Sequence, residues 1–127
     1  MYKRQLSRLL APAADVLVLP EPTPGSEPSW FGYLMTVREG AGVTRDEIVR
    51  ALEENKVQTR MLFAGNMLRQ PCFDGMRERG EGFRVAGELA NTDRIMNDAF
   101  WIGVYPGMTG EMLEFMAKVV LDAVGRG

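Results

Sequence analysis

The 127-residue chain contains no histidine and only one cysteine, Cys72. Without histidine it cannot build a Ser-His-Asp or Cys-His catalytic group, a histidine-ligated zinc site or a histidine general base. One cysteine cannot form an internal disulfide, which is typical of proteins in a reducing cytoplasm. We therefore expect a cytoplasmic protein with no metal site, in which Cys72 is an inert, partly buried thiol.

Long apolar runs and an excess of one charge are also missing. No stretch approaches the roughly 18–20 apolar residues that span a bilayer, and no apolar region of a signal peptide follows the first residues. Fifteen basic residues are balanced by seventeen acidic ones and are scattered along the chain, unlike the basic patch of a nucleic-acid-binding protein. The sequence thus predicts one domain that binds neither nucleic acid nor membrane.

What is present is the pattern of a small α+β domain. The apolar run at 100–105, closed by Pro106 and Gly107, predicts a central strand that is buried on both faces. Thr44 and Glu47 have the spacing of a capping box at the start of a helix. The same patterns predict further elements: strands at 15–19, 30–38 and 57–63, and helices at 6–10, 45–55, 91–97 and 109–124. We expect about three strands covered by two main helices.

The sequence also predicts which side chains share a face in one strand and in the last helix, and where the chain divides. In the strand at 30–38, the residues expected on one face are Phe31, Tyr33, Met35 and Val37. In the last helix, the residues expected on one side are Met112, Leu113, Met116, Val120 and Val124. Four prolines between residues 20 and 29 exclude regular structure there. We therefore divide the chain into residues 1–29, interpreted as the end of an interdomain helix plus a linker, and a domain at 30–127.

Polar residues after the strand at 57–63 are the candidate binding groups. Asn66 and Gln70 could hydrogen-bond sugar hydroxyls, and the planar fork of Arg69 could bind a phosphate. The alternative is an ordinary solvated loop. Residues 74–87 are interpreted as a solvated excursion, and Asp93 as a helix cap. No catalytic or cofactor-binding residue is predicted.

Three segments of the sequence resemble a known family: SWFGYLMTVR, TRMLFAGNMLRQPCF and NTDRIMNDAFWIGVYPGMTGEML. They are similar to the C-terminal portion of the DegT/DnrJ/EryC1/StrS group of sugar aminotransferases, whose fold is that of type I aminotransferases. Within that group, the third segment resembles the RfbH-type branch of nucleotide-sugar 3-dehydratases. The resemblance extends from about residue 6 to residue 124.

The resemblance implies a function that this chain cannot carry out alone. Such dehydratases use pyridoxamine phosphate, held mostly by a large N-terminal domain, and some hold a [2Fe-2S] cluster on N-terminal cysteines. They remove the C3 hydroxyl of a CDP-linked 4-keto-6-deoxyhexose during synthesis of 3,6-dideoxyhexoses for lipopolysaccharide O-antigen, with a histidine as base. The chain is then interpreted as an inactive C-terminal fragment that binds no cofactor alone and belongs to an enzyme that is a homodimer when complete.

One departure from the family pattern bears on the reaction. Related aminotransferases carry approximately T-R-x-x-Y-x-P-L-H after this strand, whereas residues 59–68 read TRMLFAGNML. Leu68 replaces the histidine, or its place is shifted onto Arg69, which favours dehydration over transamination. The residues predicted to contact the substrate are Asn66, Arg69 and Gln70. Two alternatives stay open: a free-standing binding or assembly module, and the small domain of a sugar aminotransferase.

Overall fold

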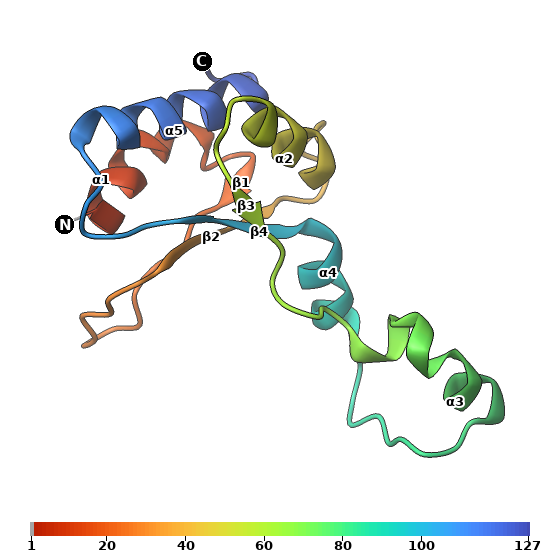
Figure 1. Cartoon of the computed structure of the whole chain (residues 1–127). Helices are drawn as coiled ribbons and strands as arrows, with labels where there is room; N and C mark the ends of the chain where they lie inside the picture. Colours follow the sequence, from red (N-terminus) through yellow and green to blue (C-terminus); the bar gives the residue numbers. More distant parts are fainter. Residues whose placement is uncertain (1) are drawn as a thin grey trace.

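A four-stranded antiparallel sheet with helices packed on one face forms the body of the protein (Figure 1). The computed structural model describes residues 2–127. The strand order is β1-β2-β4-β3, with β1 at Leu17–Val18, β2 at Gly32–Val37, β3 at Thr59–Arg60 and β4 at Ala99–Gly103. The covering helices are α1 (Tyr2–Leu9), α2 (Arg45–Glu54) and α5 (Gly110–Ala123). This confirms the predicted α+β class.

The core lies between the sheet and these helices. Tyr33 pairs with Ile102 and Met35 with Phe100 across β2 and β4, and all four side chains are fully buried. Each such side chain contributes about 1.5–3 kcal/mol when it leaves water. The helices, together with Leu10 directly after α1, complete the core with fully or almost fully buried side chains: Leu6, Leu10, Ile48, Leu52, Leu113 and Val120. The predicted buried face of β2 is therefore confirmed from Tyr33 to Val37.

Local signals at the helix ends are also confirmed. The Thr44 amide donates to Glu47 Oε2 over 2.7 Å, and the Glu47 amide donates to Thr44 Oγ1 over 3.3 Å. These two bonds form the predicted capping box at the start of α2. Thr109 caps α5 by accepting from the Met112 amide, and Gly125 follows the helix with φ +69°.

Several strand and helix predictions were wrong in detail. The sheet has four strands where about three were expected, the strand predicted at 15–19 is reduced to β1, and the helix predicted at 6–10 lies at Tyr2–Leu9. The central strand ends at Gly103 and is not buried on both faces along its length. On the face opposite the helices Ala99 is buried, but Trp101 is only half-buried and Gly103 is exposed. Phe31 precedes β2 and is 68% exposed. The strand at 57–63 shortens to β3 because a tight turn, in which the Phe63 amide donates to Met61 O, ends it. Met112 lies beside the buried stripe of α5 and is 42% exposed.

Residues 64–89, which we call the arm, extend away from the sheet and helices (Figure 1). The arm contains two 3₁₀ turns, Met67–Arg69 and Pro71–Phe73, and a short helix α3 (Asp74–Arg79) that the sequence analysis did not predict. From residue 67 to residue 89 no side chain is buried. Cys72 is exposed, so its predicted partial burial was wrong. Helix α4 (Ala90–Asp98) then leads the chain back into β4.

The N-terminal residues are part of the same core. Leu6 and Leu10 are fully buried, and α1 packs against α5. The Ser7 hydroxyl also lies 2.9 Å from the Tyr33 hydroxyl on β2. The division at residue 29 stays a prediction about a longer polypeptide. Within residues 2–127, no helix is long and apolar enough to cross a membrane.

Candidate functional site

The root of the arm is held by three side chains, Asn66, Arg69 and Asp93, which we call the root cluster. Arg69 Nε and Nη2 donate to the two carboxylate oxygens of Asp93 over 2.9 and 2.7 Å. Asn66 Nδ2 donates to Asp93 Oδ1 over 2.7 Å. The sequence places Asp93 on α4, 27 residues after Asn66, so the cluster joins the start of the arm to the helix that ends it.

Asn66 is the buried member of the cluster, with only 4% of its surface exposed. Its side-chain oxygen accepts from the Leu68 amide, which caps the 3₁₀ turn at Met67–Arg69. Its backbone amide donates to Met96 Sδ over 3.3 Å. Because both groups of its amide are already bonded, Asn66 shapes the arm root as it stands and would have to exchange a partner to contact a sugar.

Charge pairing dominates the electrostatics of the cluster. The Arg69 guanidinium, and then the Asn66 amide, lower the pKa of Asp93 from 3.8 to about 2. Asp93 in turn raises the pKa of Arg69. The carboxylate is therefore ionised throughout the physiological range and keeps the bidentate arrangement with Arg69. Arg69 remains 62% exposed along its side chain.

The interpretation of Asp93 as a helix cap was wrong. Leu89 occupies the N-cap position of α4 without a side-chain cap bond, and Asp93 lies inside the first turn. Its role depends on residues 24 and 27 positions earlier in the chain, a separation that no local spacing rule covers. This is the site residue that sequence reasoning missed.

A hollow of about 340 Å³ lies beside the root cluster, lined by Asn66, Leu68, Arg69, Arg77, Leu89 and Asp93. Arg77 donates to the Leu68 carbonyl and pairs with Asp74. Arg69 Nη1 has no hydrogen-bond partner among residues 2–127. Volumes of about 300–1,000 Å³ are typical of small-ligand sites. Two guanidinium groups at one hollow can bind a phosphate group.

The third predicted residue, Gln70, does not line this hollow. Its Nε2 atom donates to the Ala64 carbonyl over 2.6 Å, so it stabilises the arm root next to the cluster. The structure thus brings Asn66 and Arg69 together on Asp93 and leaves Gln70 beside them. Larger hollows, of about 700 Å³, lie along α1 and the proline-rich segment, where no site residue was predicted.

The hollow does not fit a pyridoxal or pyridoxamine phosphate site. None of its lining residues is a lysine or a histidine, so it offers no group to bind the cofactor aldehyde or to act as base on it. Within the described chain, no three Cys, Asp or Glu side chains are grouped as metal ligands. A single cysteine cannot supply the thiolates of an iron–sulfur cluster.

Comparison with known proteins gives a consistent family match. Residues 2–121 match the model of the DegT/DnrJ/EryC1/StrS aminotransferase family. The chain is 50% identical over 113 residues to the lipopolysaccharide biosynthesis protein RfbH of Salmonella typhimurium, covering 89% of this chain and 25% of that protein. It is 40% identical over 110 residues to the dTDP-4-dehydro-2,6-dideoxy-D-glucose 3-dehydratase of Saccharopolyspora spinosa, covering 87% and 23%.

Solved structures show the same fold. The Escherichia coli GDP-4-keto-6-deoxy-D-mannose-3-dehydratase with bound hydrated pyridoxal phosphate superposes with a TM-score of 0.72 at 19% identity, over 94% of this chain and 30% of that one. A 3-amino-5-hydroxybenzoic acid synthase superposes with a TM-score of 0.73 at 24% identity, over 99% and 33%. The chain therefore spans about a quarter of its curated relatives and about a third of these solved chains.

Proposed function

Because the chain belongs to the DegT/DnrJ/EryC1/StrS aminotransferase family, we propose that it is the C-terminal portion of a nucleotide-sugar 3-dehydratase. The observation that carries this proposal is the 50% identity to the Salmonella RfbH protein across 89% of the chain. The proposed substrate is a CDP-linked 4-keto-6-deoxyhexose, and the proposed setting is O-antigen synthesis in the cytoplasm. The similar proteins from Saccharopolyspora and Yersinia, which are named for dTDP and GDP sugars, support the 3-dehydration.

In this proposal the root cluster binds the substrate at the arm root. Arg69 uses its free Nη1 to hold a phosphate oxygen of the sugar nucleotide, while Asp93 fixes the guanidinium plane. Gln70 and Asn66 hydrogen-bond to sugar hydroxyls. To do so, Asn66 exchanges one of its present hydrogen-bond partners. None of these residues moves a proton in the reaction. Their contribution is to bind and orient the sugar nucleotide.

The remaining groups of the reaction come from outside this chain. The relatives are about four times as long as the segment they share with it, and their larger portion would hold the cofactor. We propose that pyridoxamine phosphate, a histidine base and, in some enzymes, a [2Fe-2S] cluster belong to that portion. The complete enzyme would be a homodimer. By itself, the 127-residue chain would bind no cofactor and be inactive.

A chimaeric enzyme tests the proposal. Residues 2–121 of this chain would replace the matching segment of the Salmonella RfbH protein. The chimaera would be assayed with a CDP-4-keto-6-deoxyhexose and an excess of pyridoxamine phosphate, whose oxidation to pyridoxal phosphate and ammonia supplies the two electrons that loss of the C3 hydroxyl requires. We expect the chimaera to convert the sugar and the 127-residue chain not to. A stoichiometric absorbance band of pyridoxal phosphate on the free chain would contradict the proposal. So would a folded, cofactor-loaded chimaera that does not convert the sugar.

One alternative reaction shares the fold. The solved structures that match include proteins named as aminotransferases, so the fold does not separate transamination from dehydration. The lack of the aminotransferase histidine, whose place is taken by Leu68 or is shifted onto Arg69, favours dehydration. A chimaera that transfers an amino group to the 4-keto sugar, without loss of its C3 hydroxyl, would favour the aminotransferase.

A further inference from the structure

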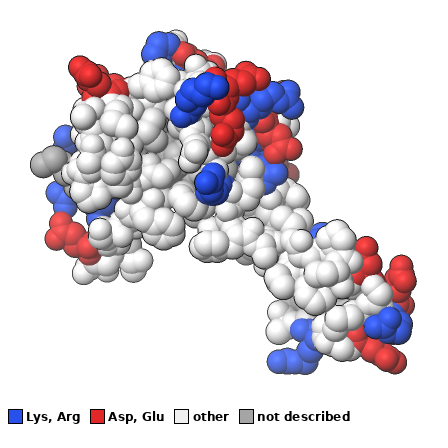
Figure 2. Space-filling model, viewed as in Figure 1, with Lys and Arg blue, Asp and Glu red and all other residues white. Residues whose placement is uncertain are grey.

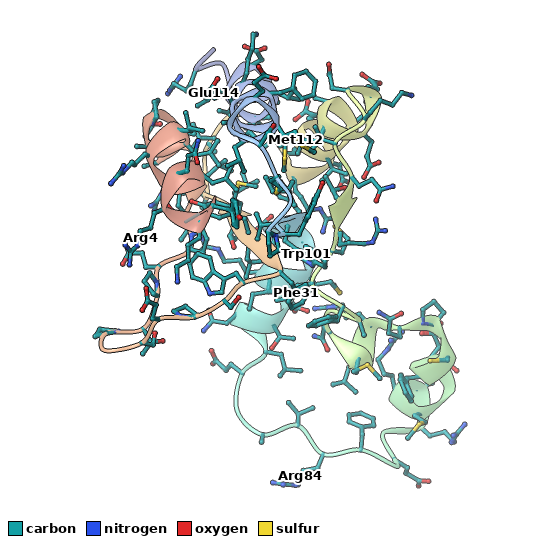
Figure 3. All side chains as sticks on the ribbon, turned by 60° about the vertical axis from the view of Figure 1, so that its left-hand side comes forward. Arg4, Phe31, Arg84, Trp101, Met112 and Glu114 are labelled. Carbon is teal, nitrogen blue, oxygen red and sulfur yellow. The ribbon has the colours of Figure 1, made fainter. Side chains whose placement is uncertain are left out.

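The sheet face opposite α1, α2 and α5 carries an exposed apolar surface. We call it the open-face patch and define it by Phe31, Leu34, Leu62, Phe63 and Trp101. Phe31 is 68% and Phe63 80% exposed. Figure 3 shows Phe31 and Trp101 close together, away from Met112 and Glu114 on α5. The patch lines a hollow of about 290 Å³ whose surface contains no charged residue.

The shape of the patch is fixed by close packing within the sheet. A Cβ atom on Gly32 would come within 2.6 Å of Trp101 Cε3, so the indole lies directly against the backbone of β2. Phe31 then meets Trp101 edge to face, with ring centroids 5.3 Å apart and an interplanar angle of 83°. The two rings are held in one arrangement, which lowers the entropy that a binding partner would have to remove.

Phe63 adds a strained residue to the same surface. Its φ angle is +48°, a left-handed conformation that costs a non-glycine residue roughly 1–2 kcal/mol. The side chain recovers little of this by burial, since 80% of it is exposed. Strain of this kind concentrates where a residue serves a contact or a site. Phe63 therefore directs its ring outward in a strained conformation, and within this chain the ring does little to stabilise the fold.

The surroundings of the patch favour an apolar partner. Figure 2 shows charged side chains gathered over the helices and the far end of the arm, with a largely uncharged surface between them. Five side chains are far fewer than the roughly 20–30 residues per partner that a stable interface between separate proteins uses. A small apolar contact is sufficient where the partner is tethered, because a short linker gives an effective concentration of about millimolar.

We propose that the open-face patch is the docking surface for the larger, cofactor-holding portion of this family's polypeptide. The inference rests on the proposed function, in that the relatives carry about three-quarters of their length outside the segment shared with this chain. Phe31 and Phe63 insert into that portion, and Trp101 forms the floor between them. Docking removes the apolar hollow from water and offsets the strain at Phe63 with burial.

Oxidative footprinting tests the docking surface. Hydroxyl radicals would label the free 127-residue chain and the chimaera, and modification of each aromatic residue would be read by mass spectrometry. We expect Phe31, Phe63 and Trp101 to be labelled in the free chain and to lose that labelling in the chimaera. Phe115, which is 50% exposed on α5, is the matched control and should be labelled equally in both.

Each outcome separates the docking surface from the proposed function. Equal labelling of the patch in the free chain and in an active chimaera overturns the docking surface and leaves the dehydratase proposal standing. Loss of labelling in a chimaera that loads cofactor but has no dehydratase activity supports the docking surface and overturns the function. Loss of labelling in the free chain as its concentration rises would assign the patch to a second copy and overturn the proposal.

A second measurement covers a chimaera that does not fold. The Salmonella RfbH protein would be labelled intact and as its isolated C-terminal quarter, over the peptides that match residues 30–34 and 61–64. We expect less labelling of these peptides in the intact protein. Equal labelling of the two forms would overturn the proposal without any use of the chimaera.

Discussion

Asp93 is the residue on which the candidate site depends. It accepts from Asn66 and from both donors on one edge of Arg69, so it neutralises the arginine and fixes its plane. Without the carboxylate, the buried Asn66 amide would lose the acceptor for its Nδ2 group. Unsatisfied groups of this kind cost about 1–3 kcal/mol. The arm root is therefore specified by one carboxylate that is distant in the sequence.

The pH dependence of stability tests the role of Asp93. Its pKa is lowered from 3.8 to about 2 in the folded state, so the stabilisation is complete above about pH 5 and is lost as pH falls toward 2. The Asp93→Asn variant should lose less unfolding free energy than the parent between pH 5 and pH 2. Urea titrations at several pH values measure this.

The control is Glu114→Gln on the outer side of α5 (Figure 3), which removes a carboxylate that makes no hydrogen bond or ion pair within residues 2–127. Glu47 and Glu53 also have lowered pKa values because threonine groups donate to them, and they are common to every variant compared. If the parent and Asp93→Asn curves run parallel, the cluster does not stabilise the fold in the way described.

A substitution of Arg69 tests whether the root cluster binds the substrate. A charged hydrogen bond to phosphate is worth about 1.5–3 kcal/mol, so Arg69→Ala in the chimaera should raise KM about 10- to 100-fold. Arg84→Ala removes another exposed arginine, from the far part of the arm (Figure 3), and should leave KM unchanged. Equal effects of the two substitutions would mean that Arg69 has no specific contact with the sugar nucleotide.

A substitution at Phe63 tests whether its ring stabilises the free chain or serves only the docking surface. In the free chain, Phe63→Gly should raise the unfolding free energy by up to about 1 kcal/mol, because glycine adopts positive φ without strain. Lys56, with φ +63°, is the matched position, and Lys56→Gly should behave similarly. Thermal unfolding of the two variants measures both effects. A large loss of stability in Phe63→Gly alone would show that the ring supports the fold of the free chain.

At the scale of elements, the arm is joined to α4 by close packing as well as by charge. Gly65 has φ +63°, and a Cβ atom there would lie 2.4 Å from Met96 Cγ. Met96 Sδ also accepts from the Asn66 amide. The turn after β3 and the last part of α4 can therefore approach each other only with glycine at position 65.

Two glycine substitutions separate this contact from backbone strain. Gly80→Ala, with φ +68° and open space around the added atom, should cost about 1 kcal/mol through its backbone alone. Gly65→Ala should cost more, because Met96 must also move. Urea denaturation of the two variants gives the difference. If both variants lose the same stability, the contact between Gly65 and Met96 contributes nothing.

At the scale of the whole molecule, the sequence predicted the core better than the site. Regular alternation in β2 and a capping box in α2 are local signals, and both were confirmed. The open face was missed because an apolar run such as 100–105 does not reveal that Trp101 would lie on an uncovered side. Asp93 and Asn66 meet only through the fold of the arm, so their contact could not be predicted from spacing. The function was predicted from the family resemblance and not from the residue patterns.

We propose that this chain completes a nucleotide-sugar 3-dehydratase. The most direct measurement is mass spectrometry of the sugar product made by the chimaera that carries residues 2–121. We expect a product that has lost the C3 hydroxyl. A product that has gained a 4-amino group and retained the C3 hydroxyl would contradict it, as would recovery of unchanged sugar from a folded, cofactor-loaded chimaera.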